Sequence, residues 1–197
     1  MKTIMKSFFV VVLLLMSAGV SAQVPIELGV KAGANLSNFS KGDWDAKVGF
    51  NAGITADINF APSMYVLTGL EFTMKGGKND IAGVKLTANP MYLQLPVHFG
   101  YKLEVMSGTN IVFRAGPYLA YGIAGKAKAK KGSVEESIDF FGKDANRRFD
   151  YGIGGGVGAE FGKIGVTLGY DFGLNKLVDA DGAAKNQNAY LSLGYRF

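Results

Sequence analysis

The chain has 197 residues, which is enough for one domain and too few for two of ordinary size. Its 28 glycines are about twice the usual share, and only 19% of its residues are charged, a composition that excludes a disordered tail protein. Zero cysteines exclude a disulfide framework and a thiolate metal site, and one histidine argues against a multi-histidine metal centre. We therefore expect no enzyme that depends on such a site.

Residues 1–22 have the pattern of an export signal. Lys2 and Lys6 precede an apolar run over residues 8–16, and Ser21 and Ala22 belong to a small-residue stretch that a signal peptidase reads. We expect cleavage after Ala22, which leaves residues 23–197 as the mature domain and lowers the net charge from +5 to +3. The apolar run is too short for a membrane-spanning helix. The scattered basic residues form no stripe for a phosphate backbone, so we expect no nucleic-acid partner.

From Glu27 onward the sequence alternates with a period of two, which is typical of β-strands. The alternating segments have about the length that a tilted transmembrane strand needs, which is about 9–11 residues, with some overhang. They number eight and cover residues 28–37, 48–60, 64–74, 91–103, 111–123, 149–161, 164–174 and 189–197.

One face of the predicted strands carries no charge, as in the series Val48, Phe50, Ala52 and Ile54, while the other is rich in glycine and carries both signs of charge. A soluble sandwich or lipocalin would place bulky residues inside and charges outside. Small residues instead suit the inside of a narrow barrel, and a uniformly apolar column suits lipid. We therefore predict an all-β fold, an eight-stranded antiparallel up-and-down transmembrane β-barrel in the bacterial outer membrane, since only a closed barrel leaves no strand edge unpaired in lipid.

The connections between the predicted strands alternate between short and long. Residues 61–63, 104–110 and 162–163 are short turns, whereas residues 38–47, 75–90, 124–148 and 175–188 are predicted to be long loops. In barrels of this class the short turns face the periplasm and the long loops face outward. We expect both termini to be periplasmic.

Several segments resemble a known family. They are residues 31–37 (KAGANLS), 92–97 (YLQLPV), 116–121 (GPYLAY), 168–177 (LGYDFGLNKL) and 191–197 (LSLGYRF), and they resemble the PorT-like small outer-membrane β-barrel family of Bacteroidetes. The resemblance implies a barrel fold and, through a member that takes part in protein secretion, partners among envelope or secretion proteins. The end of the chain, with Tyr195 and Phe197, is similar to the signal that the barrel assembly machinery recognises.

The inward face carries charged residues in nearly balanced numbers. Because unpaired buried ions are costly, this balance favours a paired network that plugs the lumen, and eight strands leave a lumen just wide enough for side chains. The alternative is a charged channel lining. We assign His98 to the lumen as a hydrogen-bonding residue. The predicted network consists of Lys31, Asp57, Glu71, His98, Lys102, Arg114, Asp150, Glu160, Asp171 and Arg196.

The longest predicted loop, residues 124–148, combines basic and aromatic residues. Its basic half suits lipopolysaccharide phosphates and its aromatic residues suit a partner protein, with a plain solvated loop as the alternative. The candidate residues are Lys126, Lys128, Lys130, Lys131, Phe140, Phe141, Arg147 and Arg148. Residues 154–159 (GGGVGA) match a dinucleotide fingerprint in form, but a strand follows them where that motif needs a helix. We predict no catalytic, metal or cofactor site.

The leading functional hypothesis is a non-enzymatic outer-membrane barrel that displays its long loops for surface interaction or for envelope or secretion assembly, in contact with lipid and lipopolysaccharide. Two alternatives stay open. One is a narrow porin-like channel gated by the lumenal charges. The other is a secreted soluble barrel that binds a small ligand.

Overall fold

The computed structural model describes residues 24–81, 83–141, 148–175 and 184–197. The predicted signal segment, residues 1–22, and Arg147 lie outside these ranges. No helix within them is long and apolar enough to cross a membrane.

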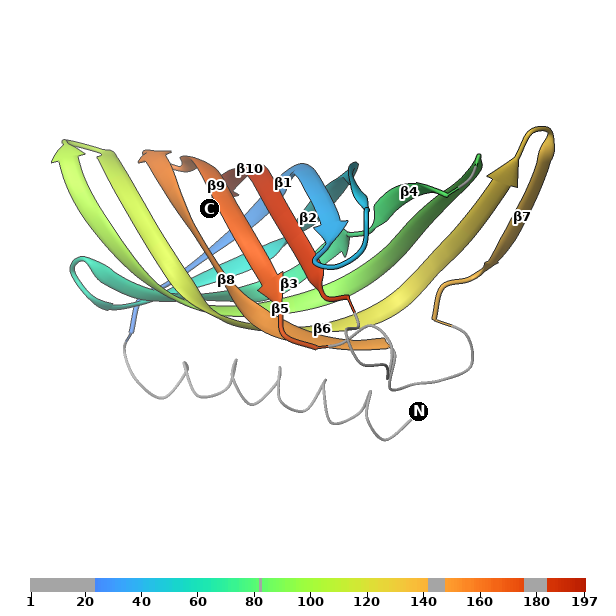
Figure 1. Ribbon diagram of the computed structural model, residues 1–197. Coiled ribbons are helices and arrows are strands. Elements are labelled where there is room, and N and C mark those ends of the chain that lie inside the picture. The colour runs from blue at the N-terminus through green and yellow to red at the C-terminus, as the bar shows by residue number, and fades with distance from the viewer. Residues whose placement is uncertain (1–23, 82, 142–147, 176–183) are drawn as a thin grey trace.

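Ten antiparallel strands make up the described chain (Figure 1). They are β1 (Ile26–Phe39), β2 (Asp45–Ala61), β3 (Met64–Met74), β4 (Gly77–Ile81), β5 (Val84–Met106), β6 (Thr109–Lys131), β7 (Val134–Asp139), β8 (Phe149–Phe161), β9 (Ile164–Gly173) and β10 (Asn186–Arg196).

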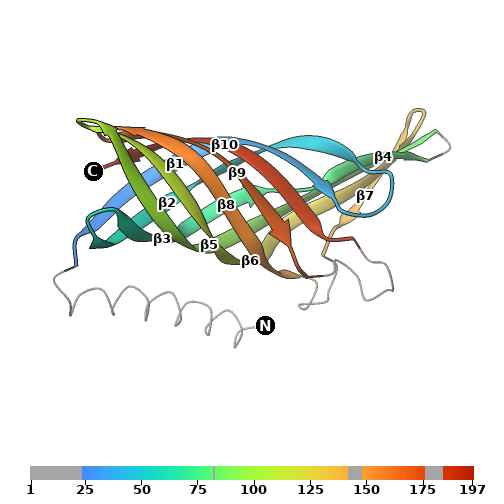
Figure 2. The ribbon, with the colours of Figure 1, turned by 60° about the vertical axis from the view of Figure 1, so that its left-hand side comes forward.

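Eight of the strands close into a ring by backbone pairing between neighbours, in the order β1, β2, β3, β5, β6, β8, β9, β10 and back to β1. Figure 2 shows the closure, where β10 runs beside β1; Val30 lies opposite Tyr195 there. The predicted eight-stranded antiparallel barrel is therefore confirmed. We call the end with the three short turns the turn end and the opposite end the loop end. The described chain enters the ring at Ile26 and leaves it at Arg196, both at the turn end.

The prediction of long loops over residues 75–90 and 124–148 is wrong for most of their length. β5 and β6 are each 23 residues long and continue past the ring, and β4 and β7 pair with their extensions. The period-two pattern in fact persists there, because lysine and alanine alternate from Lys126 to Lys130. The turns between the paired strands contain Gly83 and Gly132, whose φ angles of 77° and 58° suit glycine. We call β4, β7 and these extensions of β5 and β6 the projecting sheet (Figure 1).

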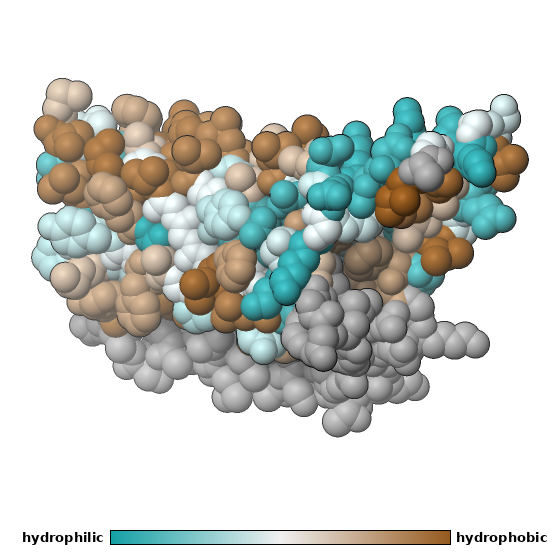
Figure 3. All heavy atoms as spheres, viewed as in Figure 1, coloured by the Kyte–Doolittle hydropathy of each residue, from teal (hydrophilic) through white to brown (hydrophobic). Residues whose placement is uncertain are grey.

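The barrel wall is apolar outside, as the alternation predicts. Large hydrophobic side chains such as Ile54, Phe99 and Leu168 are each more than half exposed. Figure 3 shows hydrophobic residues gathered toward the turn end and hydrophilic ones toward the projecting sheet. Leu95 departs from the pattern: it is only 3% exposed although its column faces outward. It lies where the pairing of β3 with β5 is interrupted, between the pairs Thr68–Val97 and Glu71–Gln94.

Glycines on the inner face make room for large lumenal rings. A side chain at Gly100 would collide with the Tyr65 ring, and one at Gly169 would collide with the Tyr190 ring. Both tyrosines are buried inside the barrel. The many inward glycines therefore have a packing role, because a narrow barrel has space for a large ring only where the neighbouring strand carries no side chain.

Candidate functional site

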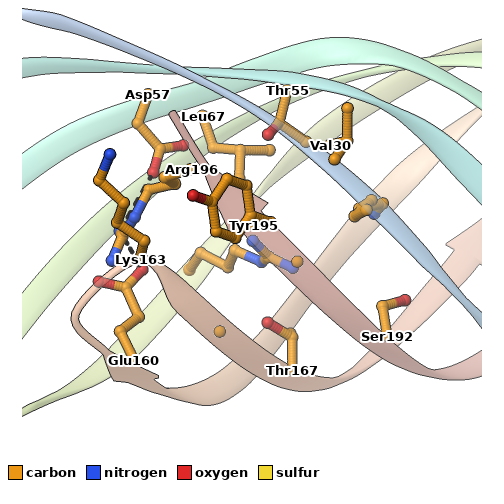
Figure 4. Close-up of a pocket in the computed structure, with 14 residues that line it drawn as sticks. Val30, Thr55, Asp57, Leu67, Glu160, Lys163, Thr167, Ser192, Tyr195 and Arg196 are labelled. Atoms are coloured by element: carbon orange, nitrogen blue, oxygen red, sulfur yellow. Dashed lines mark ion pairs between the residues drawn. The ribbon is translucent and has the colours of Figure 1, made fainter.

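The turn end of the lumen is occupied by a network of five charged side chains. The Nη1 atom of Arg196 lies 2.6 Å from Glu160 Oε1 and 3.8 Å from Asp57 Oδ2. The Nζ atom of Lys102 lies 3.3 Å from Glu27 Oε2 and 4.0 Å from Asp57 Oδ2. Figure 4 shows Arg196 between Asp57 and Glu160. Each carboxylate in the network has a basic partner, which offsets the cost of removing its charge from water.

The middle of the lumen holds a second set of the predicted inward residues. Lys31 Nζ and Glu71 Oε1 form an ion pair of 2.6 Å, and both side chains are buried. Arg114 from β6 also reaches the lumen, where it borders a small cavity. The Gln94 amide donates a hydrogen bond of 3.0 Å to Asp171. The ion pair joins β1 to β3 and the hydrogen bond joins β5 to β9 across the lumen.

His98 lies in this middle layer and is buried. Neither of its ring nitrogens has a hydrogen-bond partner among the described residues. A side chain at Gly154 would meet both the Asp171 carboxylate and the His98 ring, so this glycine leaves room for the two groups to face the same space. The structure places His98 in the lumen, and its hydrogen-bonding role stays a prediction.

A buried lysine closes the lumen at the loop end. Lys75 follows β3, is 1% exposed, and places its Nζ atom 3.3 Å from Asp150 Oδ2. The ammonium group also lies 4.4 Å from the centre of the Tyr118 ring and 5.3 Å from that of Tyr92. Asn186 donates to the same Asp150 oxygen at 3.0 Å. Ion pairing and cation–π contacts together hold this charge inside the barrel.

The open space in the lumen is small. A cavity of about 50 Å³ lies at the turn end among residues that include Asp57, Leu67, Arg114 and Arg196 (Figure 4). Such a volume holds a few water molecules. Among the described residues, no group of three or more His, Cys, Asp or Glu side chains is placed to hold a metal ion. The lumen is thus organised as a packed polar core.

The projecting sheet has two different faces. Its outer face continues the outward column of the barrel wall and carries the alternating lysines, because Thr87 pairs with Lys128 and Asn89 pairs with Lys126. Its inner face carries mostly small and apolar residues, together with Glu136, and borders a groove of about 250 Å³. The groove is lined by residues that include Trp44, Leu86, Ala88, Ala127, Ile138 and Phe140.

The structure divides the residues predicted for the long loop. Lys126, Lys128 and Lys130 lie on the outer face of β6, whereas the alternation places Lys131 on the opposite face. The prediction of Phe141 as part of a surface patch is wrong, because its side chain is 1% exposed.

The reason for the burial of Phe141 lies at Gly122. The Phe141 ring fills the space that a side chain at Gly122 would need, and it packs edge-on against Tyr92 with the ring centres 5.5 Å apart. Phe140 is partly buried against the same cluster and stacks on Phe39. The two phenylalanines therefore belong to the packing of the barrel mouth.

The sequence analysis did not predict every residue of the lumenal networks. It did not include the inward tyrosines, Glu27 or Lys75. Tyr65, Tyr92 and Tyr118 fall on the inward side of the alternation, so their parity alone could have identified them. Lys75 lies just after β3, in a segment predicted as loop, and only the tertiary structure shows that its side chain enters the barrel.

These features define a closed transmembrane β-barrel with an apolar exterior and a filled lumen. The chain belongs to the outer membrane protein β-barrel domain family, whose model matches residues 21–179. The family match and the apolar outer surface of the barrel together place the protein in the outer membrane. They do not support the alternative of a secreted soluble barrel. The narrower PorT-like assignment stays a prediction. No curated protein sequence is significantly similar to the chain.

Solved structures of outer-membrane proteins are similar to the chain. A major outer membrane protein from Thermus thermophilus matches with a TM-score of 0.52 and 15% identity, covering 88% of this chain and 100% of that chain. The attachment invasion locus protein Ail of Yersinia pestis matches with a TM-score of 0.46 and 18% identity, covering 87% and 98%. Neisserial surface protein A has a TM-score of 0.44, 11% identity and coverage of 87% and 97%. At 15% identity, the likeness to the Thermus protein concerns the fold alone.

Proposed function

We propose that the protein is a non-enzymatic outer-membrane barrel that presents its projecting sheet outside the cell as an interaction platform. The observation that carries the proposal is the continuation of β5 and β6, 23 residues each, far past the ring of strands. A transmembrane strand needs only about 9–11 residues, so the extensions are long enough to stand clear of the lipid. Ion pairs at both ends of the filled lumen give the sheet a rigid base.

The orientation is part of this proposal. The projecting sheet faces outward, and the three short turns and both termini face the periplasm, as is usual for barrels of this class. An epitope tag inserted between Gly132 and Ser133 should be labelled by antibody on intact cells. The same tag between Gly162 and Lys163 is the matched control and should be labelled only after the outer membrane is opened. The reverse pattern would exclude an outward sheet.

The interaction role is tested by shortening the sheet. Replacing residues 129–136 by a two-residue Asn-Gly turn removes the tip of the β6–β7 hairpin and leaves the pairing of β6 with β8 in the ring intact. The shortened protein should keep the heat-dependent gel mobility of a closed barrel and should lose the proteins that crosslink to the wild type on whole cells. An unchanged set of crosslinked proteins would contradict the platform role. We propose partners among envelope or secretion proteins.

We also propose that the C-terminal end contacts the barrel assembly machinery during insertion. Tyr195 and Phe197 are 45% and 69% exposed, and their rings contact each other with centres 5.8 Å apart. Phe197→Ser should lower the amount of heat-modifiable barrel in the outer membrane, while Phe161→Ser, an equally aromatic-to-polar change at another exposed turn-end position, should lower it less. Equal losses would indicate a general effect of lost apolar surface.

A further inference from the structure

A groove opens on the outer surface where the sheet forks. β6 pairs with β8 as far as Tyr121–Phe149 and pairs with β7 from Lys126–Asp139 onward, so the stretch between belongs to neither ladder. Beside this stretch lies a groove of about 680 Å³. It is the place where the outward column of the barrel wall passes into the projecting sheet.

One part of the groove is apolar. Met91, Ile123 and Ala124 line it, and Met74 adds a further side chain from β3. Met91 pairs with Ala124 in the ladder, and both continue the outward apolar columns of β5 and β6. Ile123 is 44% exposed. This part of the groove is therefore continuous with the surface that contacts lipid chains.

The other part of the groove is cationic. Lys126, Lys128 and Arg148 line it, and Asp139 is the acidic residue among the described residues that line it. Arg148 is anchored in the fork, because its Nη1 atom donates a hydrogen bond of 3.2 Å to Gly122 O and its guanidinium lies 5.3 Å from the Phe141 ring centre. Asp139 in turn accepts a hydrogen bond from the backbone N–H of Phe141.

The two lysines can both reach one ligand. Residues two apart on a strand face the same side and lie about 7 Å from each other along it, a separation that suits a headgroup with more than one anionic centre. Lys128 forms a 2.7 Å ion pair with Glu135, but both side chains are 44% exposed. A water-exposed pair of this kind exchanges readily for a more strongly charged phosphate partner.

We propose that this groove binds the phosphorylated lipid A portion of lipopolysaccharide. The phosphates contact Lys126, Lys128 and Arg148, and an acyl chain lies along Met91 and Ile123. The groove joins a cationic rim to an apolar floor in one depression, which is the arrangement that an anionic amphiphile requires. The inference rests on the outward orientation proposed above, because lipid A occupies the outer leaflet.

The test is a titration of the purified full-length barrel in neutral detergent, with bound lipid counted by native mass spectrometry. Diphosphorylated lipid A is compared with dephosphorylated lipid A and with phosphatidylglycerol. The wild type should bind the diphosphorylated lipid most tightly. The double variant Lys126→Gln/Lys128→Gln should bind it about 30-fold more weakly, from the usual contribution of two basic side chains at an anionic lipid surface.

The matched control is the double variant Lys78→Gln/Lys85→Gln. It removes the same charge from the same face of the projecting sheet, since Lys78 pairs with Thr87 and Lys85 with Lys130, but neither residue lines the groove. The control should bind lipid A like the wild type. Equal weakening in both variants, equal binding of phosphatidylglycerol, or undiminished binding of dephosphorylated lipid A would each overturn the assignment.

The experiments distinguish a failure of the lipid A proposal from a failure of the proposed platform role. The titration in detergent measures the chemistry of the groove whichever way the barrel is inserted, whereas tag labelling on cells measures orientation and needs no lipid binding. Heat-dependent gel mobility confirms that each variant still forms the closed barrel, so a loss of binding cannot arise from misfolding.

Discussion

At the scale of single residues, the lumenal side chains divide into ion pairs and rings that fit over glycines. The pair between Lys31 and Glu71, at 2.6 Å, is enclosed on all sides, whereas the pair between Lys128 and Glu135, at 2.7 Å, is in water. The two pairs therefore contribute differently to stability despite their similar distances. Loss of one partner leaves an unpaired charge shielded from water only in the buried pair.

Removal of the Lys75 charge tests this difference. Lys75→Met keeps most of the side-chain volume but leaves Asp150 without its cation, and we expect it to lower the free energy of unfolding by about 3–5 kcal/mol. Denaturant unfolding in lipid vesicles, followed by the fluorescence of the single tryptophan, Trp44, measures the change. Lys128→Met, which breaks an exposed pair, is the control and should unfold like the wild type. Equal losses would mean that Asp150 is not isolated from water.

The glycines of β9 provide a second test. A side chain at Gly169 would collide with the Tyr190 ring, so Gly169→Ala should destabilise the barrel by about 1–3 kcal/mol through overpacking. At Gly165 the nearest atom to an added Cβ is 3.8 Å away, so Gly165→Ala should cause no loss. The same vesicle unfolding assay compares them. If both substitutions are tolerated, the Tyr190 ring can move aside and the glycine has no packing role.

At the scale of elements, the β6–β7 hairpin is stabilised separately from the ring. β7 pairs only with β6 among the described strands, through Lys126–Asp139 to Lys131–Val134. Its residues are exposed from Val134 to Asp139, so cross-strand contacts replace a hydrophobic core as its support. The hairpin should therefore open more easily than the ring strands, and hydrogen exchange should be faster in β7 than in β8.

Acid should loosen this hairpin further. The hydrogen bond from Lys128 holds the pKa of Glu135 below its ordinary value of 4.5. A carboxylate whose folded pKa is depressed stabilises the fold above its unfolded pKa, and that contribution disappears as the pH falls through the lower folded pKa. Amide exchange in β7, corrected for the intrinsic pH dependence, should thus lose protection below about pH 4.5. Glu135→Gln should abolish this pH dependence; an identical profile in the variant would assign it to another group.

At the scale of the whole molecule, the filled lumen makes conduction unfavourable. Charged side chains close the turn end, and Lys75 with its tyrosines closes the loop end. The porin-like alternative therefore predicts a passage where the structure places side chains. Wild-type protein in planar bilayers should carry no single-channel current.

A variant with a widened loop end makes the electrical test decisive. Replacement of Lys75, Tyr92 and Tyr118 by alanine removes the closure at that end, while the turn-end ion pairs stay intact. This variant should still be silent, because the turn-end network and the middle layer around Lys31 and Glu71 remain in place. Steady current through the wild type, in protein whose gel mobility shifts on heating, would contradict a plugged barrel.

The alternation of residue types was sufficient to predict the ring. Strands β3 and β8 have the predicted bounds. Their residues alternate strictly with a period of two, and their outward side chains are uncharged, as a strand between lipid and a narrow lumen requires. The alternation was not sufficient to predict the β6 extension. Lysine and alanine alternate there without large apolar residues, and such a pattern is also typical of a loop. Backbone pairing with β5 and β7 holds this extension in a strand.

The sequence by itself therefore determined the class of fold, the two faces of the wall and the balance of inward charges, since these depend on local periodicity and composition. Only the tertiary structure decided which charges pair, that Lys75 enters the lumen, that Phe141 is buried and that a groove forms at the fork of β6. The physical reason is that such contacts join residues from strands far apart in the chain, as Lys75 and Asp150 show, and the register of a closed barrel sets them.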